Sequence, residues 1–475
     1  MKILLVNPHV PLSLLYGEKL KKMGAVLPPL GIFYIASYLR NRKDTEVEIL
    51  DANALNYDAN TVVEYIKKNN PNLVGFSCTT TAYGYAKEIA QKIRENNPEL
   101  RILAGGAHAQ AAADDILADN HALFDFVCYG EGETAMESLI DHLSGKISKI
   151  HLRGWKYLEN DAVVTSLPAE IPDNLDIFGH PSEIMPTSLI RHYHEKVNAY
   201  MKLPMSAIMS SRGCPFNCFF CSSPEKFKNI YGKKVRYHST EWIIKEMEIF
   251  RSRSGVKEII FLDDTFNLDK NRVREFCQKK KAARIAMKWS CNFEAAIADQ
   301  ELFHAMKKAG CWTVMLGGES GSDKILKFIH KGVTAAQLLM AGKWAARAGI
   351  LTRVSFIFGL PTETEETISE TIDLIHKSDF HFPYFQLYMP LPGTALYRIL
   401  SQYGTISPDI EKRMTAGTVN YIPNGLSSEI LQRSIKSAYR RCYLNWRMIK
   451  NHLSAIRAPS DAVRLLRGVS FFFRL

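Results

Sequence analysis

Residues 211–223 read Ser211-Arg212-Gly213-Cys214-Pro215-Phe216-Asn217-Cys218-Phe219-Phe220-Cys221-Ser222-Ser223, with three cysteines in a C-x3-C-x2-C spacing. The apolar run Met205–Ser210 predicts a short strand, so the cysteines lie in a loop that leaves a strand end. Pro215 and Asn217 mark a turn, which argues against three core cysteines clustered by chance. Thiolates on one loop favour a soft metal centre: zinc, copper(I) or an iron–sulfur cluster.

The number of cysteines in this loop bears on the kind of metal centre. A structural zinc site takes four ligands, usually in paired spacing, and no fourth Cys or His follows nearby. Three thiolates on a cube of four irons would instead leave one iron open to a substrate or cofactor. The spacing therefore favours a catalytic iron–sulfur centre, and a non-catalytic metal-binding module is the alternative.

The cysteine loop resembles the signature of the radical S-adenosylmethionine (SAM) superfamily, over roughly residues 200–400. In that family three cysteines hold a 4Fe–4S cluster, and SAM chelates the fourth iron through its amino and carboxylate groups. The resemblance implies that Cys214, Cys218 and Cys221 hold the cluster and that Phe220 packs near the adenine.

Composition places the chain among ordinary globular proteins. It has 475 residues, 46% hydrophobic and 23% charged, which predicts two or three domains. The nine cysteines are odd in number and only one cluster stands out among them, which favours a reducing cytoplasm over a disulfide framework. We expect no signal peptide at the N-terminus and no membrane span.

Residues 1–145 alternate between strand and helix patterns. This alternation predicts a Rossmann-like, doubly wound parallel sheet, which binds ligands at the carboxyl ends of its strands. The expected strands are Lys2–Asn7, Val47–Asp51, Leu73–Ser77, Arg101–Ala104 and Phe124–Tyr129, and the expected helices are Leu30–Arg40, Thr61–Lys68, Ala82–Glu95, Ala112–Ala118 and Thr134–Leu143.

The expected strand ends carry hydroxyls and glycines, at 77–81, 105–108 and 129–133. No G-x-G-x-x-G loop follows the first strand, so this is no dinucleotide fingerprint. The alternative is that these glycines serve only the backbone conformation of the turns and bind no ligand. These segments, with Pro28-Pro29-Leu30-Gly31-Ile32, resemble the cobalamin-binding domain that precedes some radical SAM domains.

The resemblance to that domain implies a set of cobalamin contacts. Leu30 and Gly31 would face the corrin, and the nucleotide-tail slot would be lined by Ser77, Thr79, Gly105 and Gly106, with His108 and Glu131 in the same motifs. The D-x-H-x-x-G motif with a cobalt-ligating histidine is absent, so cobalamin without a histidine ligand fits. A loop histidine, His9, is expected to face solvent rather than cobalt.

The rest of the chain divides into three regions. Residues 146–200, with a hairpin-like stretch at Trp155–Val164 and several prolines, are expected to form a linker. Residues 201–400 hold six strand–helix units, too few for a closed eight-fold barrel, so an open six-unit (β/α) partial TIM barrel is expected. Residues 401–475 are expected to be helical, with one helix over Leu431–Ile449.

Polar residues at the ends of the barrel strands are the candidate SAM contacts. By the family resemblance they are Ser290, Asn292, Gly317, Gly318, Glu319 and Gly359. Many relatives carry an arginine for the SAM carboxylate near residue 294, but Glu294 stands here, and Arg353 is the suggested substitute. Asp263 and Asp264 are either a helix cap with a solvated acid or polar groups beneath the substrate.

The C-terminal segment 464–475 mixes Arg464, Arg467 and Arg474 with bulky apolar residues. Such a segment can lie on an anionic membrane surface, and a helical lid packed on the barrel is the alternative. A nucleic-acid partner is not expected, because no binding fold accompanies the charge of +11.

The combined resemblance implies a cobalamin-dependent radical SAM enzyme with a 4Fe–4S cluster, SAM and cobalamin. Methylation of an unactivated carbon on a small-molecule or lipid-like substrate is the expected reaction. An oxidative ring-forming reaction, as in the anaerobic tetrapyrrole cyclases, is the alternative. A one-electron reductant of the flavodoxin or ferredoxin type is the expected partner, and the expected location is the cytoplasm, with peripheral membrane contact through the C-terminus. A methylthio-transferring RNA enzyme is disfavoured, since no second three-cysteine set is present.

Overall fold

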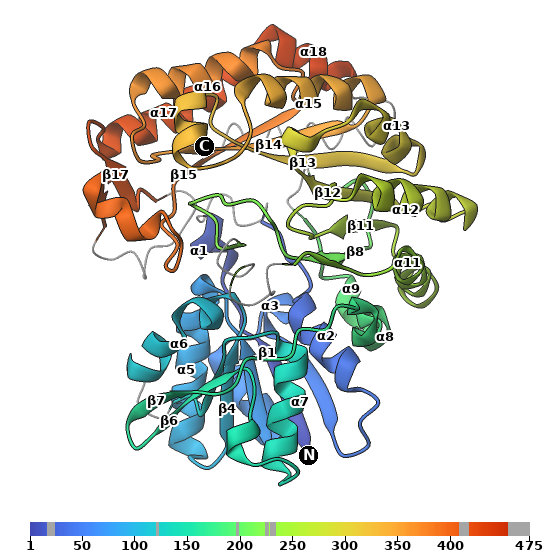
Figure 1. Cartoon of the computed structure of the whole chain (residues 1–475), viewed down its shortest axis with the longest axis vertical. Coiled ribbons are helices and arrows are strands. Elements are labelled where there is room, and N and C mark those ends of the chain that lie inside the picture. Colours follow the sequence, from blue (N-terminus) through green and yellow to red (C-terminus); the bar gives the residue numbers. More distant parts are fainter. Residues whose placement is uncertain are drawn as a thin grey trace. The chain divides into compact units, whose positions relative to one another are not determined.

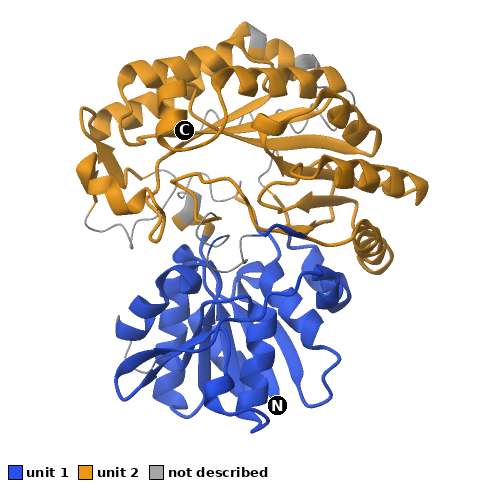
Figure 2. Ribbon diagram, in the orientation of Figure 1, with its two compact units in different colours: residues 1–11, 26–193, 228–236 blue, residues 12–25, 194–227, 237–475 orange. Residues whose placement is uncertain are grey.

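The structure is a computed structural model that describes residues 1–16, 24–119, 123–195, 199–223, 228, 234–407 and 418–454. The chain forms two compact units, which Figure 2 shows in different colours. Unit 1 contains residues 1–11, 26–193 and 228–236, and unit 2 contains residues 12–25, 194–227 and 237–475.

Unit 1 is built on a seven-stranded sheet in the order β2-β1-β3-β4-β5-β6-β7. Its first five strands pair in parallel, and the β6–β7 hairpin adds two antiparallel strands beside β5. The strands are β1 (Lys2–Asn7), β2 (Glu46–Asp51), β3 (Leu73–Ser77), β4 (Arg101–Gly105), β5 (Phe126–Cys128), β6 (Trp155–Glu159) and β7 (Ala162–Thr165).

Helices cover both faces of this sheet because its strands are apolar on both sides. Leu4 and Val6 of β1 pack in one core with α4, α5 and α6, whereas Ile3 and Leu5 pack in the other with α2 and α7. The helical segments of unit 1 are α2 (Leu30–Leu39), α3 (Ala52–Leu55), α4 (Ala59–Asn69), α5 (Thr80–Asn96), α6 (Ala107–Asp119), α7 (Gly132–Leu143), η2 (Lys149–His151), η3 (Leu175–Phe178), α8 (Pro181–Ile184) and α9 (Thr187–Ile190).

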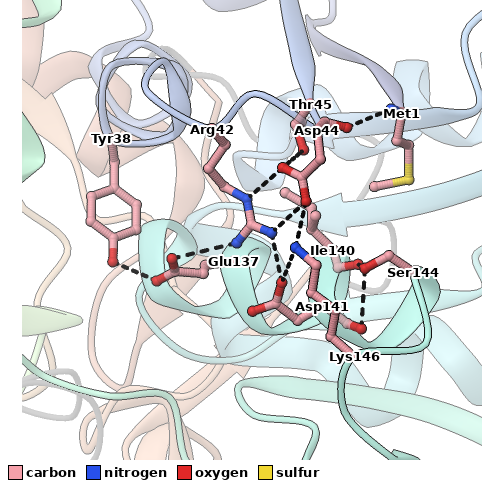
Figure 3. Close-up of polar contacts among 10 residues, drawn as sticks. All are labelled: Met1, Tyr38, Arg42, Asp44, Thr45, Glu137, Ile140, Asp141, Ser144 and Lys146. Carbon is pink, nitrogen blue, oxygen red and sulfur yellow. Dashed lines mark hydrogen bonds and ion pairs between the residues drawn. The ribbon is translucent and has the colours of Figure 1, made fainter.

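An ion-pair network fastens the end of α2 to α7 (Figure 3). The Arg42 guanidinium lies 2.6 Å from Asp141 and 3.5 Å from Glu137, both on α7, and it also pairs with Asp44. The hydroxyl of Tyr38 donates to Glu137 at 2.5 Å. These contacts raise the pKa of Arg42 and lower that of Asp44, so both groups are charged at neutral pH. The network ties the two helices on this face of the sheet together.

Unit 2 contains a six-stranded parallel sheet whose spatial order follows the chain, from β8 through β11, β12, β13 and β14 to β15. Figure 1 shows α13, α15 and α16 along one side of these strands. The strands are β8 (Met205–Ile208), β11 (Glu258–Phe261), β12 (Lys288–Phe293), β13 (Cys311–Glu319), β14 (Leu351–Phe358) and β15 (Phe382–Leu387), and the short strand β9 (Ser211–Arg212) follows β8.

The helices of unit 2 alternate with these strands as the sequence predicts. They are α11 (Thr240–Ser254), α12 (Lys270–Ala282), η4 (Ala295–Ile297), α13 (Gln300–Lys308), α14 (Asp323–Phe328), α15 (Ala335–Ala348) and α16 (Glu365–Lys377), with the short α1 (Leu12–Tyr16) earlier in the chain. The two-residue strand β10 (Arg236–Tyr237) falls where the division between the units crosses the chain.

Beyond the barrel strands the chain forms η5 (Tyr397–Gln402), the antiparallel pair β16 (Gly404–Ile406) and β17 (Tyr421–Pro423), α17 (Ser428–Tyr443) and α18 (Trp446–Ser454). The single helix expected over Leu431–Ile449 is therefore two helices, which separate after Tyr443. Among the residues that the structure describes, every helix is too short or too polar to span a bilayer. The segment 464–475, with its predicted membrane or lid role, lies outside the described residues.

The observed architecture confirms the predicted fold class: a Rossmann-like sheet, an open six-stranded partial barrel and a C-terminal helical region. Residues 146–193, which the sequence assigns to a linker, pack as part of unit 1. Their hairpin extends the first sheet, and Trp155 is buried with its indole N–H donating to the carbonyl of Ala135 at 2.8 Å. Several prolines within this segment suggested a linker, but the alternating apolar residues of β6 bury one face of the hairpin.

Candidate active site

The cysteine loop leaves the carboxyl end of β8 and β9, as the sequence predicts. Cys218 is buried, and Cys214 and Cys221 are partly buried. Burial raises the pKa of Cys218 to about 12; nearby Lys331 lowers it, and Cys221 and Cys214 raise it further. The three thiols are thus close enough to influence one another's ionisation. Among the described residues, no three His, Cys, Asp or Glu side chains converge closely enough for a single metal ion.

Asp263 anchors the backbone where the chain enters this loop. Its side chain is fully buried and accepts hydrogen bonds from the backbone N–H of Ser210 at 2.7 Å and from the hydroxyls of Ser210 and Ser211, each at 2.6 Å. Burial raises the pKa of Asp263, and these hydrogen bonds work in the opposite direction. The cap of the following helix, α12, is Asp269 instead, so Asp263 is a structural brace of the loop.

Phe219 fixes the middle of the loop. Its ring stacks on His330, with ring centroids 3.8 Å apart. Its backbone N–H donates to the carbonyl of Ile329 at 3.0 Å, and its carbonyl accepts from the N–H of Leu396 at 2.8 Å. Phe220, the predicted adenine neighbour, is partly buried against the apolar cluster that includes Leu360. Phe219 packs against the same cluster, so both phenylalanines hold the loop against the segment that follows β14.

Three charged side chains gather next to the loop. The Lys331 ammonium lies 3.2 Å from Glu294 Oε2 and 3.5 Å from Glu319 Oε1, and all three side chains are more than nine-tenths buried. Burial works against the charged lysine, but Glu319 and Glu294 raise the pKa of Lys331, so it stays protonated. Burial raises the pKa of Glu319, and Lys331 opposes that rise. Two carboxylates thus share one ammonium.

The remaining predicted SAM contacts lie around these strand ends. A Cβ on Gly317 would meet the carboxylate of Glu319 and lie 2.8 Å from Lys331 Nζ, and one on Gly318 would lie 2.8 Å from Val354, so a larger residue at either position would displace these side chains. Gly359 has a positive φ of 88° and donates its N–H to the buried Glu363. Ser290 is buried within β12, and the amide of Asn292 donates to the carbonyl of Asp263 at 2.9 Å.

Arg353 is engaged elsewhere. Its guanidinium pairs with Glu195 at 2.8 Å, and it is the third residue of β14. Phe358, the last residue of the strand, lies five positions later, or about 16 Å along an extended strand. This placement weighs against Arg353 as the partner of a ligand at the carboxyl ends of the strands.

Unit 1 gathers most of the predicted cobalamin contacts at the carboxyl ends of β3 and β4. Ser77 pairs in register with Gly105, and the N–H of His108 donates to the carbonyl of Cys78 at 3.0 Å. Thr79 is exposed and caps α5, and its hydroxyl accepts from the N–H of Ala82. The hydroxyls and the open backbone at the carboxyl ends of these two strands fit the polar tail of a large ligand.

Gly106 and Gly31 differ in what surrounds the Cβ position that a glycine leaves empty. Gly106 has a φ of 92°, and a Cβ there would lie 2.8 Å from the carbonyl oxygen of Cys78. Gly31, in the first turn of α2 beside the buried Leu30, is exposed, and nothing lies within 4 Å of the Cβ that it lacks. Gly106 is therefore required by the backbone, whereas Gly31 leaves free space that a bulky ring would fit.

Glu131 has a different environment from the other cobalamin candidates. Its carboxylate pairs with the guanidinium of Arg236, and both side chains are buried. The same guanidinium donates to the carbonyl of Pro172 at 2.9 Å. The loop after β5 is thereby fixed from within unit 1.

Comparison with known proteins finds a separate family model in each half of the chain. The B12 binding domain family model matches residues 20–140, and the Radical SAM superfamily model matches residues 208–375. An "Uncharacterized methyltransferase" of Pyrococcus horikoshii is 33% identical over 94% of this chain and 93% of its own length. The chain belongs to the cobalamin-binding radical SAM family.

A further relative and two solved structures resemble the chain at lower identity. The anaerobic magnesium-protoporphyrin IX monomethyl ester cyclase of Rubrivivax gelatinosus is 26% identical over 94% of this chain and 78% of its own length. The solved structure of OxsB with aqua-cobalamin and SAM has a TM-score of 0.72 at 17% identity, covering 100% of this chain and 71% of that one. TsrM from Kitasatospora setae with cobalamin and a [4Fe-4S] cluster has a TM-score of 0.70 at 18% identity, covering 98% and 90%.

Membership of this family confirms the three cofactor classes predicted from the sequence: cobalamin, SAM and a 4Fe–4S cluster. The sequence did not point to Lys331, Phe219 or the Asp263 brace. A lone lysine before a glycine carries no motif, and only the fold brings Lys331 to Glu294, 37 positions earlier.

Proposed function

We propose that the chain is a cobalamin-dependent radical SAM methyltransferase that methylates an unactivated carbon of a small-molecule or lipid-like substrate. The observation that carries the proposal is the 33% identity to a methyltransferase across both units, over 94% of the chain. The thiols of the loop and the open sheet edge of unit 1 support it, because they suit the cluster and cobalamin respectively.

The roles of this chain's residues follow from their places. Bound cluster and SAM would supply a one-electron route to a substrate carbon radical, and bound cobalamin would supply the methyl group. Cys214, Cys218 and Cys221 would hold the cluster, and Asp263 and Phe219 would keep their loop in shape. Gly317, Gly318, Glu319 and Gly359 would line the SAM site together with Phe220, Ser290 and Asn292. Ser77, Thr79, Gly105, Gly106 and His108 would line the cobalamin tail slot, with Leu30 and Gly31 toward the ring.

A second candidate reaction is oxidative ring formation without methyl transfer. It is favoured by one observation, the 26% identity to the Rubrivivax gelatinosus cyclase over 94% of this chain. Both reactions begin with abstraction of a hydrogen atom from carbon, so the residues around the cluster serve either one. The products distinguish them.

The test uses anaerobically reconstituted full-length protein with SAM labelled in its methyl group and a chemical reductant. Methylation would release S-adenosylhomocysteine from the SAM that gives its methyl group, and methionine with 5′-deoxyadenosine from the SAM that is cleaved. The substrate would gain the label. A cyclase would form 5′-deoxyadenosine with an unlabelled product and no S-adenosylhomocysteine. Protein that contains zinc without sulfide and forms neither compound would overturn the proposal and favour a non-catalytic metal module.

Three further predictions belong to this proposal. A flavodoxin- or ferredoxin-type reductant would deliver the electrons, and purified candidates can replace the chemical reductant in the same assay. The protein is proposed to act in the cytoplasm, without a nucleic-acid partner.

Peripheral membrane contact through the C-terminus is tested by vesicle co-sedimentation of the full chain against a version that ends at Pro459.

A further inference from the structure

Cys214, the first cysteine of the loop, has a hydrogen-bond partner from outside the loop. The hydroxyl oxygen of Thr265 lies 3.5 Å from the sulfur of Cys214, which is a hydrogen-bond distance for the large sulfur atom. Thr265 is buried, 6% exposed, and follows β11, so 51 positions separate it from Cys214 in the chain. A thiolate that ligates iron has no proton to donate, so the hydroxyl of Thr265 would be the donor in protein that holds the cluster.

The short segment that carries Thr265 is fixed on both sides. Before it, the carboxylate of Asp263 accepts the backbone N–H of Ser210 at 2.7 Å, where the chain enters the cysteine loop. After it, Phe266 is 1% exposed, its ring packs on aromatic rings of β11 and α12, and its N–H donates to a backbone carbonyl of β12 at 3.2 Å. One segment thus braces the loop and carries the hydroxyl, so packing sets the distance from Thr265 to Cys214.

The other donors to the cysteine sulfurs come from the backbone of the loop. The backbone N–H of Phe216 reaches the sulfur of Cys214, and that of Ser223 donates to Cys221 at 3.4 Å. Burial raises the pKa of the Cys214 thiol, and the hydrogen bonds from Thr265 and Phe216 lower it, so both donors favour the thiolate. A backbone donor remains when a side chain is changed, whereas the hydroxyl of Thr265 can be removed alone.

A hydrogen bond to a ligating sulfur acts on the reduction potential of an iron–sulfur cluster, as do burial and net charge. When a reductant gives one electron to the bound cluster, the charge of the cluster with its ligands becomes more negative by one, and no bond is made or broken. A donor beside the sulfur stabilises the more negative state to a greater extent. Such a donor therefore raises the potential and favours reduction.

We propose that Thr265 is a positioning residue that donates a hydrogen bond to the sulfur of Cys214 and thereby raises the reduction potential of the bound cluster. The inference rests on the proposed function, since it needs a cluster on Cys214. Thr265 follows Asp263 and Asp264 directly in the chain. The loop after β11 would thus both brace the cysteine loop and adjust how readily the cluster accepts an electron.

The test measures the midpoint potential of the cluster in anaerobically reconstituted full-length protein. Titration with titanium(III) citrate, followed by electron paramagnetic resonance of the reduced cluster, gives this potential without substrate or turnover. Thr265→Val removes the hydroxyl at nearly constant volume, and Thr265→Ser restores a donor. Thr313→Val is the matched control, because the hydroxyl of Thr313, buried in β13, donates to the backbone carbonyl of Leu351 at 3.0 Å. Iron and sulfide contents are measured for each protein.

We expect Thr265→Val to lower the ratio of reduced to oxidised cluster, at a fixed applied potential, by roughly 3- to 10-fold, the range for losing one hydrogen bond. This change corresponds to a midpoint potential that is more negative by about 30–60 mV, at about 59 mV per tenfold change for one electron. Thr265→Ser should lie within about twofold of the wild type in this ratio, since it keeps the donor. Thr313→Val should match the wild type.

An unchanged potential in Thr265→Val, at equal iron content, would overturn the inference. A shift in Thr265→Ser as large as that in Thr265→Val would also overturn it, because the hydroxyl would then not be the cause. If Thr265→Val takes up no iron, Thr265→Ala is titrated in the same way: a more negative potential supports the inference, and an unchanged potential or a second loss of iron overturns it. Wild-type protein that takes up no iron and sulfide is a separate outcome, in which the proposed function itself fails.

Discussion

The guanidinium of Arg236 holds the carboxylate of Glu131, with NH1 3.1 Å from Oε2 and side chains that are 1% and 2% exposed. Replacement of Arg236 by Met would leave a buried carboxylate without its cation. We expect the free energy of unfolding to fall by about 3–5 kcal/mol. Denaturant unfolding followed by circular dichroism measures this loss.

The matched variant for that pair is the double substitution of Glu131→Met and Arg236→Met. It removes both charges and should recover most of the lost stability, since no unpaired charge remains. A single Arg236→Met protein as stable as the wild type would show that the pair contributes little.

The cluster assignment predicts the behaviour of the nine cysteines. Cys214→Ala, Cys218→Ala or Cys221→Ala should each abolish SAM cleavage, because two protein thiolates hold a four-iron cube poorly. Iron, sulfide and 5′-deoxyadenosine are the measurements. Cys442→Ala is the control, because this buried thiol lies on α17, and the same tolerance is expected at Cys277, Cys291 and Cys311. Wild-type rates of 5′-deoxyadenosine formation in Cys218→Ala would show the assignment to be mistaken.

Cobalamin binding can be tested at Gly31 without disturbing the fold. A tryptophan there meets open space in the protein, so Gly31→Trp should fold normally yet block a ring over the start of α2. We expect loss of the cobalamin absorption spectrum after reconstitution and gel filtration, with unchanged iron content and Tm. Gly106 is unsuitable for such a test, because any side chain there would strike Cys78.

Gly84→Trp provides the control for Gly31→Trp. Gly84 is also exposed, on α5 of the same unit, and also has nothing within 4 Å of its absent Cβ. It should retain cobalamin. If Gly31→Trp retains as much cobalamin as Gly84→Trp, the ring does not lie over Gly31.

Glu363 gives the protein a pH-dependent stability. Burial raises its pKa from 4.5 to about 8, against the hydrogen bonds from the backbone of Gly359 and Leu360. The folded protein therefore holds a proton that the unfolded chain releases above about pH 4.5. Stability should fall as pH rises from about 4.5 to about 8 and then level off.

Glu363→Gln removes this dependence and keeps an oxygen that accepts the same N–H groups. Above pH 8 the variant should be more stable than the wild type by roughly 3–5 kcal/mol, and near pH 4.5 the two should be similar. Urea unfolding at several pH values is the measurement. Parallel pH profiles for both proteins would contradict the assignment of this proton to Glu363.

Local pattern was enough to predict much of the architecture. Strands β1 and β3 have the predicted bounds, Lys2–Asn7 and Leu73–Ser77, because buried parallel strands are short apolar runs with clear ends. The cysteine loop was evident because its three cysteines lie within eight consecutive residues of the chain. The hairpin β6–β7 was recognised, but its union with the first sheet was not, since pairing with β5 depends on residues far apart.

The tertiary structure decided what depends on distant contacts. The helix predicted over Leu431–Ile449 is two helices: Tyr439 of α17 packs on Phe385, and the amide of Asn451 in α18 donates to the carbonyl of Phe380. The sequence by itself determined the family and the cofactor classes and predicted the cluster cysteines, because these depend on contiguous motifs. Only folding brings Lys331 to Glu294 and Glu319, and Arg236 to Glu131, because a buried charge selects its partner by spatial proximity and leaves no periodic signal in the chain.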